Sequence, residues 1–496
     1  MSSDTSIGKT LDVDPAETGF SLRTKHLGPP RVADLPEPPS GWLKIIGPGI
    51  VGAGVGLASG EFILWPYIAS QVGLVFLWGA VVGVMTQWFL NMEIERYTLA
   101  TGETALTGFN RLGRHWGLVF AIMAHFANLW PGWATSSAAM LSYIVGGSIR
   151  WIAIAILVVV ALILTLAPRI YVALERLITV KVILIGGFFI VALALVVKGD
   201  TWAELPQAVT SFGQFPAELG FALMMGAIAY AGAGGGQNLC QSNWIRDKGF
   251  GMGIHVPSLV SPITGEKHAA RFVGAYVFPD TPENRDRWKR WWKFANVEQL
   301  ATFVLITILT ITATSLLAVA TLYGRDDVAN NISFLQTEGQ VLAETVGQWF
   351  AVLFWGIGAF SLFAAAVGIV DYTTRLMSDV LKSTYLRDRE ITESRLYTYL
   401  VLGIVGIGIA ILLAGLDQPL VLLVISGCTA GVMMFMYSIL LLVMNRTALP
   451  ASIKVRSYRV AALIWSTLFF GFMAVLALNE QLRKLFGASQ TGAGTP

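Results

Sequence analysis

Charged residues are scarce in this sequence. Asp, Glu, Lys and Arg make up only 13% of its 496 residues, whereas hydrophobic residues make up 55%. A soluble domain carries charge on about a quarter of its residues, so this composition argues against a soluble protein and indicates one embedded in a membrane. The formal net charge of +3 is too small to indicate a nucleic-acid partner.

Cysteines are also few, and the common catalytic signatures are missing. Cys240 and Cys428 lie in apolar segments, so no disulfide framework can be inferred from them. The sequence has no GxSxG, HExxH or GxxxxGK[ST] stretch. These absences disfavour an enzyme and an ATP-driven pump, and we expect no cofactor.

The first forty residues lack the apolar core of a signal peptide. They are polar and contain several prolines ("SLRTKHLGPPRVADLPEPPS"), which predicts a disordered tail over 1–40. We expect a second short tail over 481–496.

Between these tails, long apolar runs predict an all-α membrane protein with eleven transmembrane helices. Helices are expected because lipid offers no hydrogen-bond partners to an open strand. Each run has roughly 20 residues or more, enough to cross a hydrocarbon core of ~30 Å. The expected spans are 44–73, 75–98, 116–147, 149–167, 171–197, 217–244, 295–323, 344–382, 396–415, 418–444 and 459–480.

Connections rich in lysine and arginine alternate along the chain with connections that hold few of them. Because cytoplasmic loops carry the excess of positive charge, this pattern predicts a multi-pass protein of the cell membrane with a cytoplasmic N-terminus. The inner connections include one that holds Arg169, Arg176 and Lys181, whereas the outer ones hold isolated cases such as Lys198. The cytoplasmic loop 245–293 ends in "RDRWKRWWKF", a mixture suited to the lipid headgroup region rather than to RNA. The expected partners are therefore the lipid bilayer and a transported substrate, and we expect a monomer.

Two of the predicted spans are interrupted. The first contains "GPGIVGAGVGLASGE", which ends at Glu61, and the sixth contains "AGAGGGQN" over 231–238. Breaks in the first and sixth helices are typical of LeuT-type transporters, which are built from two inverted repeats of five helices. We expect repeats over 41–198 and 217–444, an extra helix over 459–480, and breaks near 57–61 and 232–237 that face each other.

The same two stretches resemble the Nramp family of divalent-metal transporters over roughly residues 44 to 445. Counted from the "GP" at Gly47, the family's D-P-G-N motif falls on Ala58, Ser59, Gly60 and Glu61. The family's A-x-x-M-P-H-N motif falls on Gly232, Gly235, Gly236, Gln237 and Asn238, of which only the Asn is identical. The resemblance implies a secondary transporter whose substrate lies between the breaks.

The family's Asp, Met and His are replaced in this sequence by Ala58, Gly235 and Gln237. The candidate ligands that remain are oxygen atoms, which suit hard cations such as Mg²⁺ or Mn²⁺. The resulting hypothesis is transport of a divalent cation by alternating access, with weak or absent proton coupling because the family's Asp and His are missing. A permease of the same fold for a small organic solute such as an amino acid is the alternative. A metal site needs several converging oxygens, whereas a solute pocket needs aromatic walls. The candidate substrate-binding residues are Ala58, Glu61, Gly232, Gly235, Gln237 and Asn238.

Other polar residues in apolar surroundings are weaker candidates. His125 could relay protons or simply bond to a neighbouring helix. Asp371 and Arg375 are four residues apart, so they share a helix face and are expected to form an ion pair, with a gate as the functional interpretation. We expect most of Glu93, Glu95, Arg96 and Glu103, at the inner end of the second helix, to face water.

Overall fold

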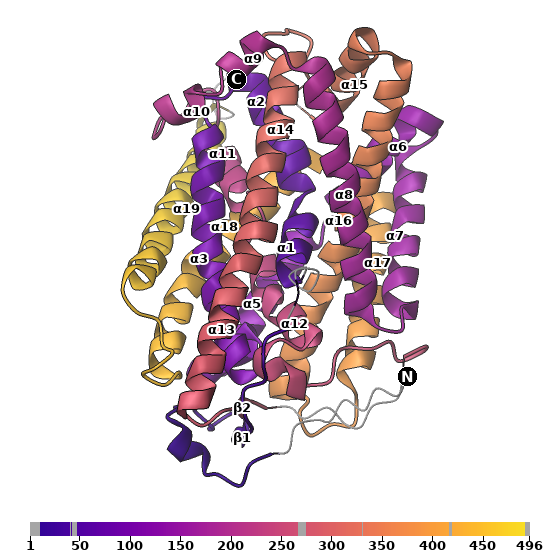
Figure 1. The fold of residues 1–496 in the computed structure, drawn as a ribbon. Coiled ribbons are helices and arrows are strands. Elements are labelled where there is room, and N and C mark those ends of the chain that lie inside the picture. Colours follow the sequence, from indigo (N-terminus) through magenta and orange to yellow (C-terminus); the bar gives the residue numbers. More distant parts are fainter. Residues whose placement is uncertain are drawn as a thin grey trace.

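The protein is a bundle of long helices that run between two ends (Figure 1). The computed structural model describes residues 10–39, 41, 47–265, 274–329, 331–415 and 419–491. A short two-stranded sheet, β1 (Arg31–Val32) with β2 (Tyr276–Val277), lies at one end, which we call the strand end. That this end is cytoplasmic stays a prediction.

The helices before residue 200 include three long ones and several short ones at the breaks and turns. They are α1 (Pro48–Gly56), η3 (Ser59–Leu64), α2 (Trp65–Val72), α3 (Leu77–Thr101), α4 (Ala105–Leu112), α5 (Trp116–Asn128), α6 (Gly132–Val145), α7 (Ile149–Leu166) and α8 (Ile170–Val196), after η1 (Pro15–Thr18).

The remaining helices follow the same pattern of long spans and short connecting turns. They are α9 (Gly199–Ala203), α10 (Gln207–Thr210), α11 (Phe221–Ala229), α12 (Gly236–Lys248), η4 (Gly251–His255), α13 (Pro282–Glu298), η5 (Gln299–Val304), α14 (Leu305–Thr321), α15 (Phe334–Thr345), α16 (Gln348–Val380), η6 (Leu381–Tyr385), α17 (Glu393–Leu413), α18 (Pro419–Thr447) and α19 (Tyr458–Thr491).

The predicted spans coincide with helices throughout the described residues. Eight helical runs there are long and apolar enough to cross a membrane. The other three predicted spans are α3, whose second half is polar, and the pairs α5–α6 and α11–α12, which are each divided into two shorter helices. The all-α membrane architecture is therefore confirmed.

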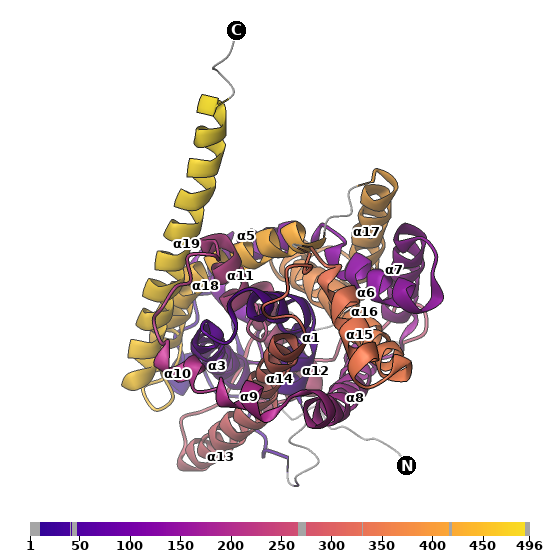
Figure 2. The same cartoon turned by 90° about the horizontal axis from the view of Figure 1, so that it is seen from above.

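The helices with broken spans lie inside the bundle, and the unbroken apolar helices surround them. Seen from above, α1 lies in the middle and α7, α17 and α19 lie at the periphery (Figure 2). The outer helices expose large apolar side chains, such as Ile190 on α8 at 73% and Leu468 on α19 at 66%. Such exposure is costly in water and favourable in lipid, so these faces meet the acyl chains.

The N-terminal segment does not form the predicted disordered tail over residues 10–39. Its strand β1 pairs in parallel with β2, so that Arg31 lies opposite Tyr276. Leu35 is fully buried, and the indole N–H of Trp291 donates to the Pro36 carbonyl at 2.7 Å. A polar, proline-containing composition does not prevent a segment from docking when an edge strand and a groove already exist. Residues 1–9 and 40 of the predicted tail lie outside the described part of the chain.

The last part of the predicted cytoplasmic loop 245–293 is helical, since residues 282–293 belong to α13. α13, η5 and α14 form one helical run, Pro282–Thr321, so the tryptophan-rich stretch extends a membrane span. Trp288 and Trp291 are buried within the protein rather than turned to headgroups. Trp292 stacks under Arg96, whose guanidinium carbon lies 4.0 Å from the ring centre.

The acidic residues near the end of α3 are buried, contrary to the expectation that most face water. Glu93 is 0% exposed and is paired with Arg96 at 2.7 Å, while Glu103 is 3% exposed and is paired with Arg111 at 2.6 Å. Arg111 also donates to the Arg23 carbonyl at 2.8 Å. The N-terminal segment therefore helps to cover this surface, which the amphipathic pattern of α3 alone cannot reveal.

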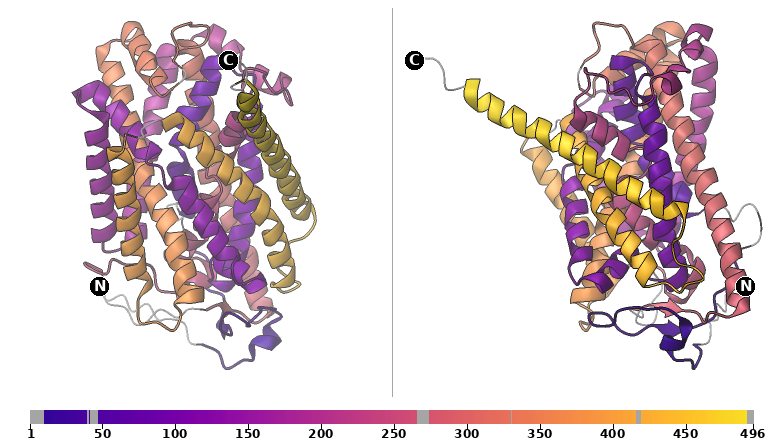
Figure 3. Two further views of the ribbon diagram at one scale, coloured as in Figure 1. Left: turned by 180° about the vertical axis from the view of Figure 1, so that it is seen from behind. Right: turned by 90° about the vertical axis from the view of Figure 1, so that its left-hand side faces the viewer.

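The last helix is longer than predicted. α19 continues past residue 480 to Thr491, so much of the predicted tail 481–496 is helical, and residues 492–496 lie outside the described chain. Its C-terminal part leaves the bundle (Figure 3).

The N-terminal segment is held mainly by apolar burial and main-chain hydrogen bonds. Arg290 hydrogen-bonds to Glu37 at 2.8 Å and lowers the pKa of that carboxyl, but both side chains are exposed. Exposed pairs of this kind contribute little to stability. The buried Leu35 is therefore the better point at which to test the docking.

We expect trypsin to spare the bond after Arg31 in the folded protein and to cut it rapidly in Leu35→Asp, because a buried carboxylate would displace the segment. The measurement is the rate at which the N-terminal fragment is lost from purified protein. Val209→Asp is the matched control, since Val209 is 77% exposed. Equal cleavage after Arg31 in the wild type and in Leu35→Asp would contradict the docked arrangement.

Candidate functional site

The first break begins where α1 ends at Gly56. Leu57 has φ −66° and ψ 64°, and Ala58 has φ −149° and ψ −101°, so neither residue continues the helix. The chain re-enters helical structure through η3, a π-helical turn that leads into α2. The predicted interruption near 57–61 is confirmed. Its non-helical part consists of Leu57 and Ala58.

The second break separates α11 from α12. α11 ends at Ala229 and α12 begins at Gly236. Between them, Gly232, Gly234 and Gly235 have φ values of 109°, 74° and 49°. Glycine alone adopts such positive φ values without a steric penalty, which explains the glycine run and confirms the second predicted break.

The two breaks lie directly against each other. A Cβ atom on Gly56 would lie 1.6 Å from the carbonyl oxygen of Gly232, and one on Gly60 would lie 2.0 Å from that of Tyr230. No side chain can be accommodated at such distances, so glycine is required at both positions. The prediction that the breaks face each other is confirmed.

One side chain bonds several backbone groups at the second break. Gln87, fully buried on α3, donates through Nε2 to the carbonyl oxygens of Ala229 and Ala231 at 3.0 and 2.9 Å. Its Oε1 accepts from the N–H groups of Ala233 and Gly234, both at 3.0 Å. Unpaired backbone groups are costly in a membrane, so this amide stabilises the broken conformation. The sequence signal for Gln87 is an amide placed deep within an apolar span.

Side chains from other helices also donate hydrogen bonds to carbonyls in α1 and at the first break. Gln237 donates through Nε2 to the Gly52 carbonyl at 2.6 Å, and Ser361 on α16 donates through Oγ to the Leu57 carbonyl at 2.9 Å. These oxygens are therefore engaged by protein donors.

Lys181 is a third side chain that donates to a carbonyl near the first break. Its position differs from the one that the sequence suggests. It belongs to α8 and is 0% exposed, whereas the charge pattern places it in a cytoplasmic connection. Its Nζ donates to the Gly54 carbonyl at 2.7 Å. That carbonyl is freed by the break, because Ala58 N–H bonds to Gly56 instead. A lone lysine between apolar neighbours was the available signal.

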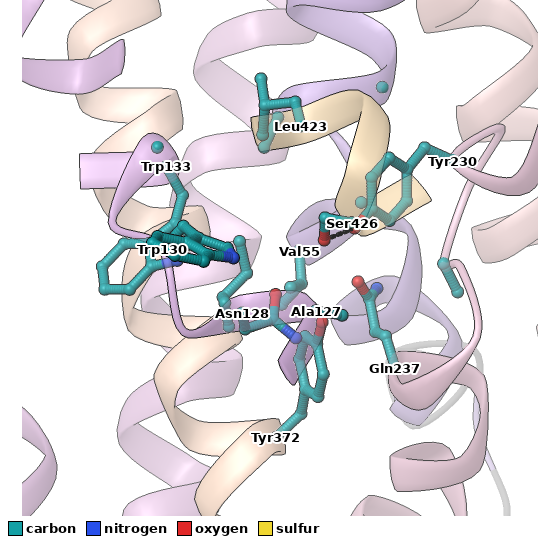
Figure 4. Close-up of a pocket in the computed structure, with 16 residues that line it drawn as sticks. Val55, Ala127, Asn128, Trp130, Trp133, Tyr230, Gln237, Tyr372, Leu423 and Ser426 are labelled. Carbon is teal, nitrogen blue, oxygen red and sulfur yellow. Dashed lines mark hydrogen bonds between the residues drawn. The ribbon is translucent and has the colours of Figure 1, made fainter. Parts of the chain in front are cut away.

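A cavity with a volume of about 30 Å³ lies between the breaks and the helices α5, α6, α16 and α18 (Figure 4). None of the described residues that line it is Asp, Glu, Lys, Arg or His. The hydroxyls of Tyr230 and Ser426 are hydrogen-bonded to each other across it. Its aromatic and neutral polar lining residues are Asn128, Trp130, Trp133, Tyr230, Gln237, Tyr372 and Ser426.

Only part of the predicted substrate-binding set reaches this cavity. Ala58 and Gln237 line it, whereas Glu61 accepts a hydrogen bond from Thr310 on α14 and lies outside it. Asn238 donates to Asn91 on α3 at 2.7 Å.

The remaining two predicted residues contribute backbone only. A Cβ atom on Gly232 would lie 2.7 Å from the ring of Phe303, and one on Gly235 would lie 2.6 Å from Ala430 Cα. The described part of the chain contains no group of three or more His, Cys, Asp or Glu side chains that could hold a metal ion. The role of the predicted residues in holding a metal ion stays a prediction.

His125 lies on α5 and is not among the residues that line the cavity. Its Nδ1 lies 2.9 Å from the Ala121 carbonyl of its own helix. This hydrogen bond is to its own helix rather than to the neighbouring helix that the sequence suggested, and a proton relay at His125 stays a prediction.

Asp371 and Arg375 form the predicted ion pair, with 2.9 Å between Asp371 Oδ1 and Arg375 Nη2. Both side chains are fully buried, and Arg375 also pairs with Asp247. Trp244 Nε1 and the Tyr397 hydroxyl donate to Asp371 at 3.1 and 2.8 Å. The pair therefore connects α16 to α12 and α17.

A second set of buried ions joins the same helices closer to the strand end. Arg246 on α12 pairs with Asp379 on α16 at 2.8 Å and with Glu393 on α17 at 3.3 Å. Buried pairs with several partners hold helices in one relative position, and breaking one of them is costly. These networks join α12, α16 and α17 on the strand side of the cavity.

Comparison with known proteins identifies the class of fold. No family model matches the chain, and no curated protein sequence matches it. Among solved structures, the fold is similar to that of LeuT-type transporters, and the long apolar helices indicate a multi-pass membrane protein.

Structures of the manganese transporter of Eremococcus coleocola are among those with a similar fold. A mutant form is similar with a TM-score of 0.67 at 13% identity, covering 96% of this chain and 92% of that one. The complex with an aromatic bis-isothiourea compound gives a TM-score of 0.68, also at 13% identity, covering 94% and 92%. At this identity the likeness concerns the fold alone.

We expect Gly56→Ala to disrupt the contact between the breaks, because the added Cβ would overlap the Gly232 carbonyl. Overpacking typically lowers stability by about 1–3 kcal/mol. We expect a loss of about 3 kcal/mol here, because the atom in the way belongs to the backbone and cannot rotate aside as a side chain can. The measurement is the thermal unfolding midpoint of the purified protein. Gly186→Ala is the control, since nothing lies within 4 Å of a Cβ there. Equal midpoints for the two variants would contradict the close approach.

Proposed function

We propose that the protein is a secondary transporter that binds a small uncharged or zwitterionic solute between its two breaks and moves it by alternating access. The observation that carries this proposal is the cavity lining, which is aromatic and neutral polar and contains no carboxylate. Small organic ligands bind in such sites through apolar walls and a few convergent polar groups. The LeuT-type fold supports the transport mechanism.

A divalent cation is the second candidate substrate. Two observations favour it: the fold is shared with a manganese transporter, and Glu61 Oε1 is buried beside the break with no hydrogen-bond partner in the described structure. Against it, a divalent ion in the cavity would meet no counter-charge, which makes its dehydration costly. The carbonyls of the first break are also engaged by Gln237 and Lys181.

Alternating access would require the cavity to change size. A volume of about 30 Å³ holds one or two water molecules, so a larger solute can enter only when the walls move apart. The ion pairs of Arg375 and Arg246 join helices on the strand side of the cavity. We expect these pairs to separate when the site opens toward that end.

Binding of neutral solutes should raise the thermal unfolding midpoint, because a ligand stabilises the state that binds it. The panel contains neutral and zwitterionic amino acids, MgCl₂ and MnCl₂, each added to the purified full-length protein. Stabilisation by amino acids alone would support the proposal. Stabilisation by Mg²⁺ or Mn²⁺ alone would replace it with the cation hypothesis.

Tyr372→Phe should weaken binding of the amino acid selected by that panel by roughly tenfold, the loss expected for one hydrogen bond in a buried site. Tyr372 lines the cavity and is 4% exposed. Tyr399→Phe is a matched control, since Tyr399 lies on α17 and is 63% exposed. Isothermal titration measures both affinities, and an equal affinity in the two variants would argue against this cavity as the site.

Glu61→Gln should leave the affinity for the solute unchanged, because Glu61 does not line the cavity, and lower stability by about 1 kcal/mol, because the substitution weakens the hydrogen bond that Thr310 donates to it. Glu61 is fully buried. The exposed Glu344→Gln variant is the control for the thermal midpoint. If the wild type binds Mn²⁺ and Glu61→Gln does not, the cation hypothesis gains the support that the solute proposal loses.

A further inference from the structure

A second hollow, an open groove beside α13, takes no part in the breaks or in the buried ion networks. It has a volume of about 330 Å³. One wall is α13, and the other is the end of the docked N-terminal segment. The described residues that line it include Pro38, Pro39, Arg290, Lys293, Phe294 and Val297. The lining therefore combines an apolar surface with two cations, and none of the described lining residues is acidic.

The walls of this groove are fixed by contacts within the protein. The indole N–H of Trp291 donates to the Pro36 carbonyl at 2.7 Å, and the Phe294 ring packs edge-on against the Trp291 ring with 5.8 Å between the ring centres. Arg290 donates to Glu37 at 2.8 Å. A groove that is formed before its ligand arrives binds that ligand without the entropic cost of ordering the walls.

The two cations of the groove differ in their partners. Arg290 is paired with Glu37, whereas Lys293 is exposed and makes no ion pair or hydrogen bond with another described side chain. The Lys293 ammonium can therefore pair with an anion from outside the chain, and Arg290 beside it adds a second positive charge.

Lys293 lies at the level where one surface of the bilayer is expected. α13, η5 and α14 form one helical run, and α13 lies at the edge of the bundle (Figure 2). At 1.5 Å per residue, the part from Lys293 to Thr321 spans roughly 42 Å, close to the ~40–45 Å of a bilayer with both headgroup layers. A lysine at such a level reaches the headgroups while its stem lies on apolar surface.

The apolar side of the groove continues into a stripe that faces lipid. Val297, Leu300, Leu305 and Leu309 are 41%, 41%, 53% and 58% exposed. They follow one another at about one helical turn, and the longest step crosses the π-helical η5. An acyl chain can lie along this stripe while its headgroup stays at the cations. A small soluble anion would use the cations but gain nothing from the stripe.

We propose that this groove is a binding site for one anionic phospholipid, whose phosphate pairs with Lys293 and Arg290 and whose acyl chain lies over Phe294 and Val297. A zwitterionic phospholipid has the same phosphate but no net charge, so the two cations attract it less. The bound lipid contacts α13 and the docked N-terminal segment at once, and so joins that segment to the bilayer. This inference goes beyond the proposed function and does not depend on which solute is carried.

The test is native mass spectrometry of the full-length protein in a neutral detergent. Phosphatidylglycerol and phosphatidylcholine with identical acyl chains are added separately, and the affinity for each is measured. Phosphatidylglycerol should bind roughly fivefold more tightly, the factor expected from one more cation–anion contact near a membrane surface. Inorganic phosphate at the same concentration should not displace it, because phosphate has no acyl chain to place on the stripe.

Three variants locate the site. Lys293→Gln should lower the affinity for phosphatidylglycerol roughly fivefold and leave that for phosphatidylcholine unchanged. Lys289→Gln is the matched control, since Lys289 lies one turn away on α13, is 75% exposed and does not line the groove. Both variants remove one positive charge, so only a specific site distinguishes them. Val297→Asn should weaken the binding of both lipids, because the acyl chain loses an apolar contact.

Three results would overturn the proposal. The first is equal affinity of the wild type for the two lipids. The second is an equal loss in Lys293→Gln and Lys289→Gln, which would indicate diffuse attraction rather than a site. The third is displacement of the lipid by inorganic phosphate, which would indicate an anion site that does not require a lipid. None of these measurements uses a transported substrate, so failure of this inference is distinguishable from failure of the solute panel.

Discussion

The structure depends on one constraint: backbone groups inside a membrane must find hydrogen-bond partners within the protein. Two helices are broken at the same level, and their breaks are in contact through Gly56 and Gly232. The groups they free cannot reach water or lipid donors. Buried side chains of Gln87, Ser361 and Lys181 therefore satisfy them.

This solution determines the chemical character of the cavity. Carbonyls that could have surrounded a metal ion are hydrogen-bonded to amide, hydroxyl and ammonium donors, and Glu61 is directed toward α14. What remains between the breaks is a small space with aromatic and neutral polar walls. The fold positions the breaks, and the side chains around them determine what can bind there.

At the strand end, buried ion pairs and the docked N-terminal segment lie next to each other. The carboxylates of Glu93 and Glu103 are buried in pairs with arginines, and the docked N-terminal segment lies over part of this surface. The networks of Arg375 and Arg246 join α12, α16 and α17 on the same side of the cavity. A movement that opens the cavity toward this end must separate buried ions, which favours discrete closed and open states over a gradual change.

The sequence by itself determined the membrane setting, the number and order of the spans and the two breaks. Hydropathy is imposed by the lipid, and a glycine run makes an uninterrupted helix unfavourable. The ion pair of Asp371 with Arg375 was also predictable, because residues four apart share a helix face. The tertiary structure alone decided which side chains line the cavity, that Lys181 lies at the first break, and that residues 10–39 dock. These outcomes depend on the rotation of each helix about its axis and on contacts between residues far apart in sequence, such as Lys181 with Gly54, which no local pattern encodes.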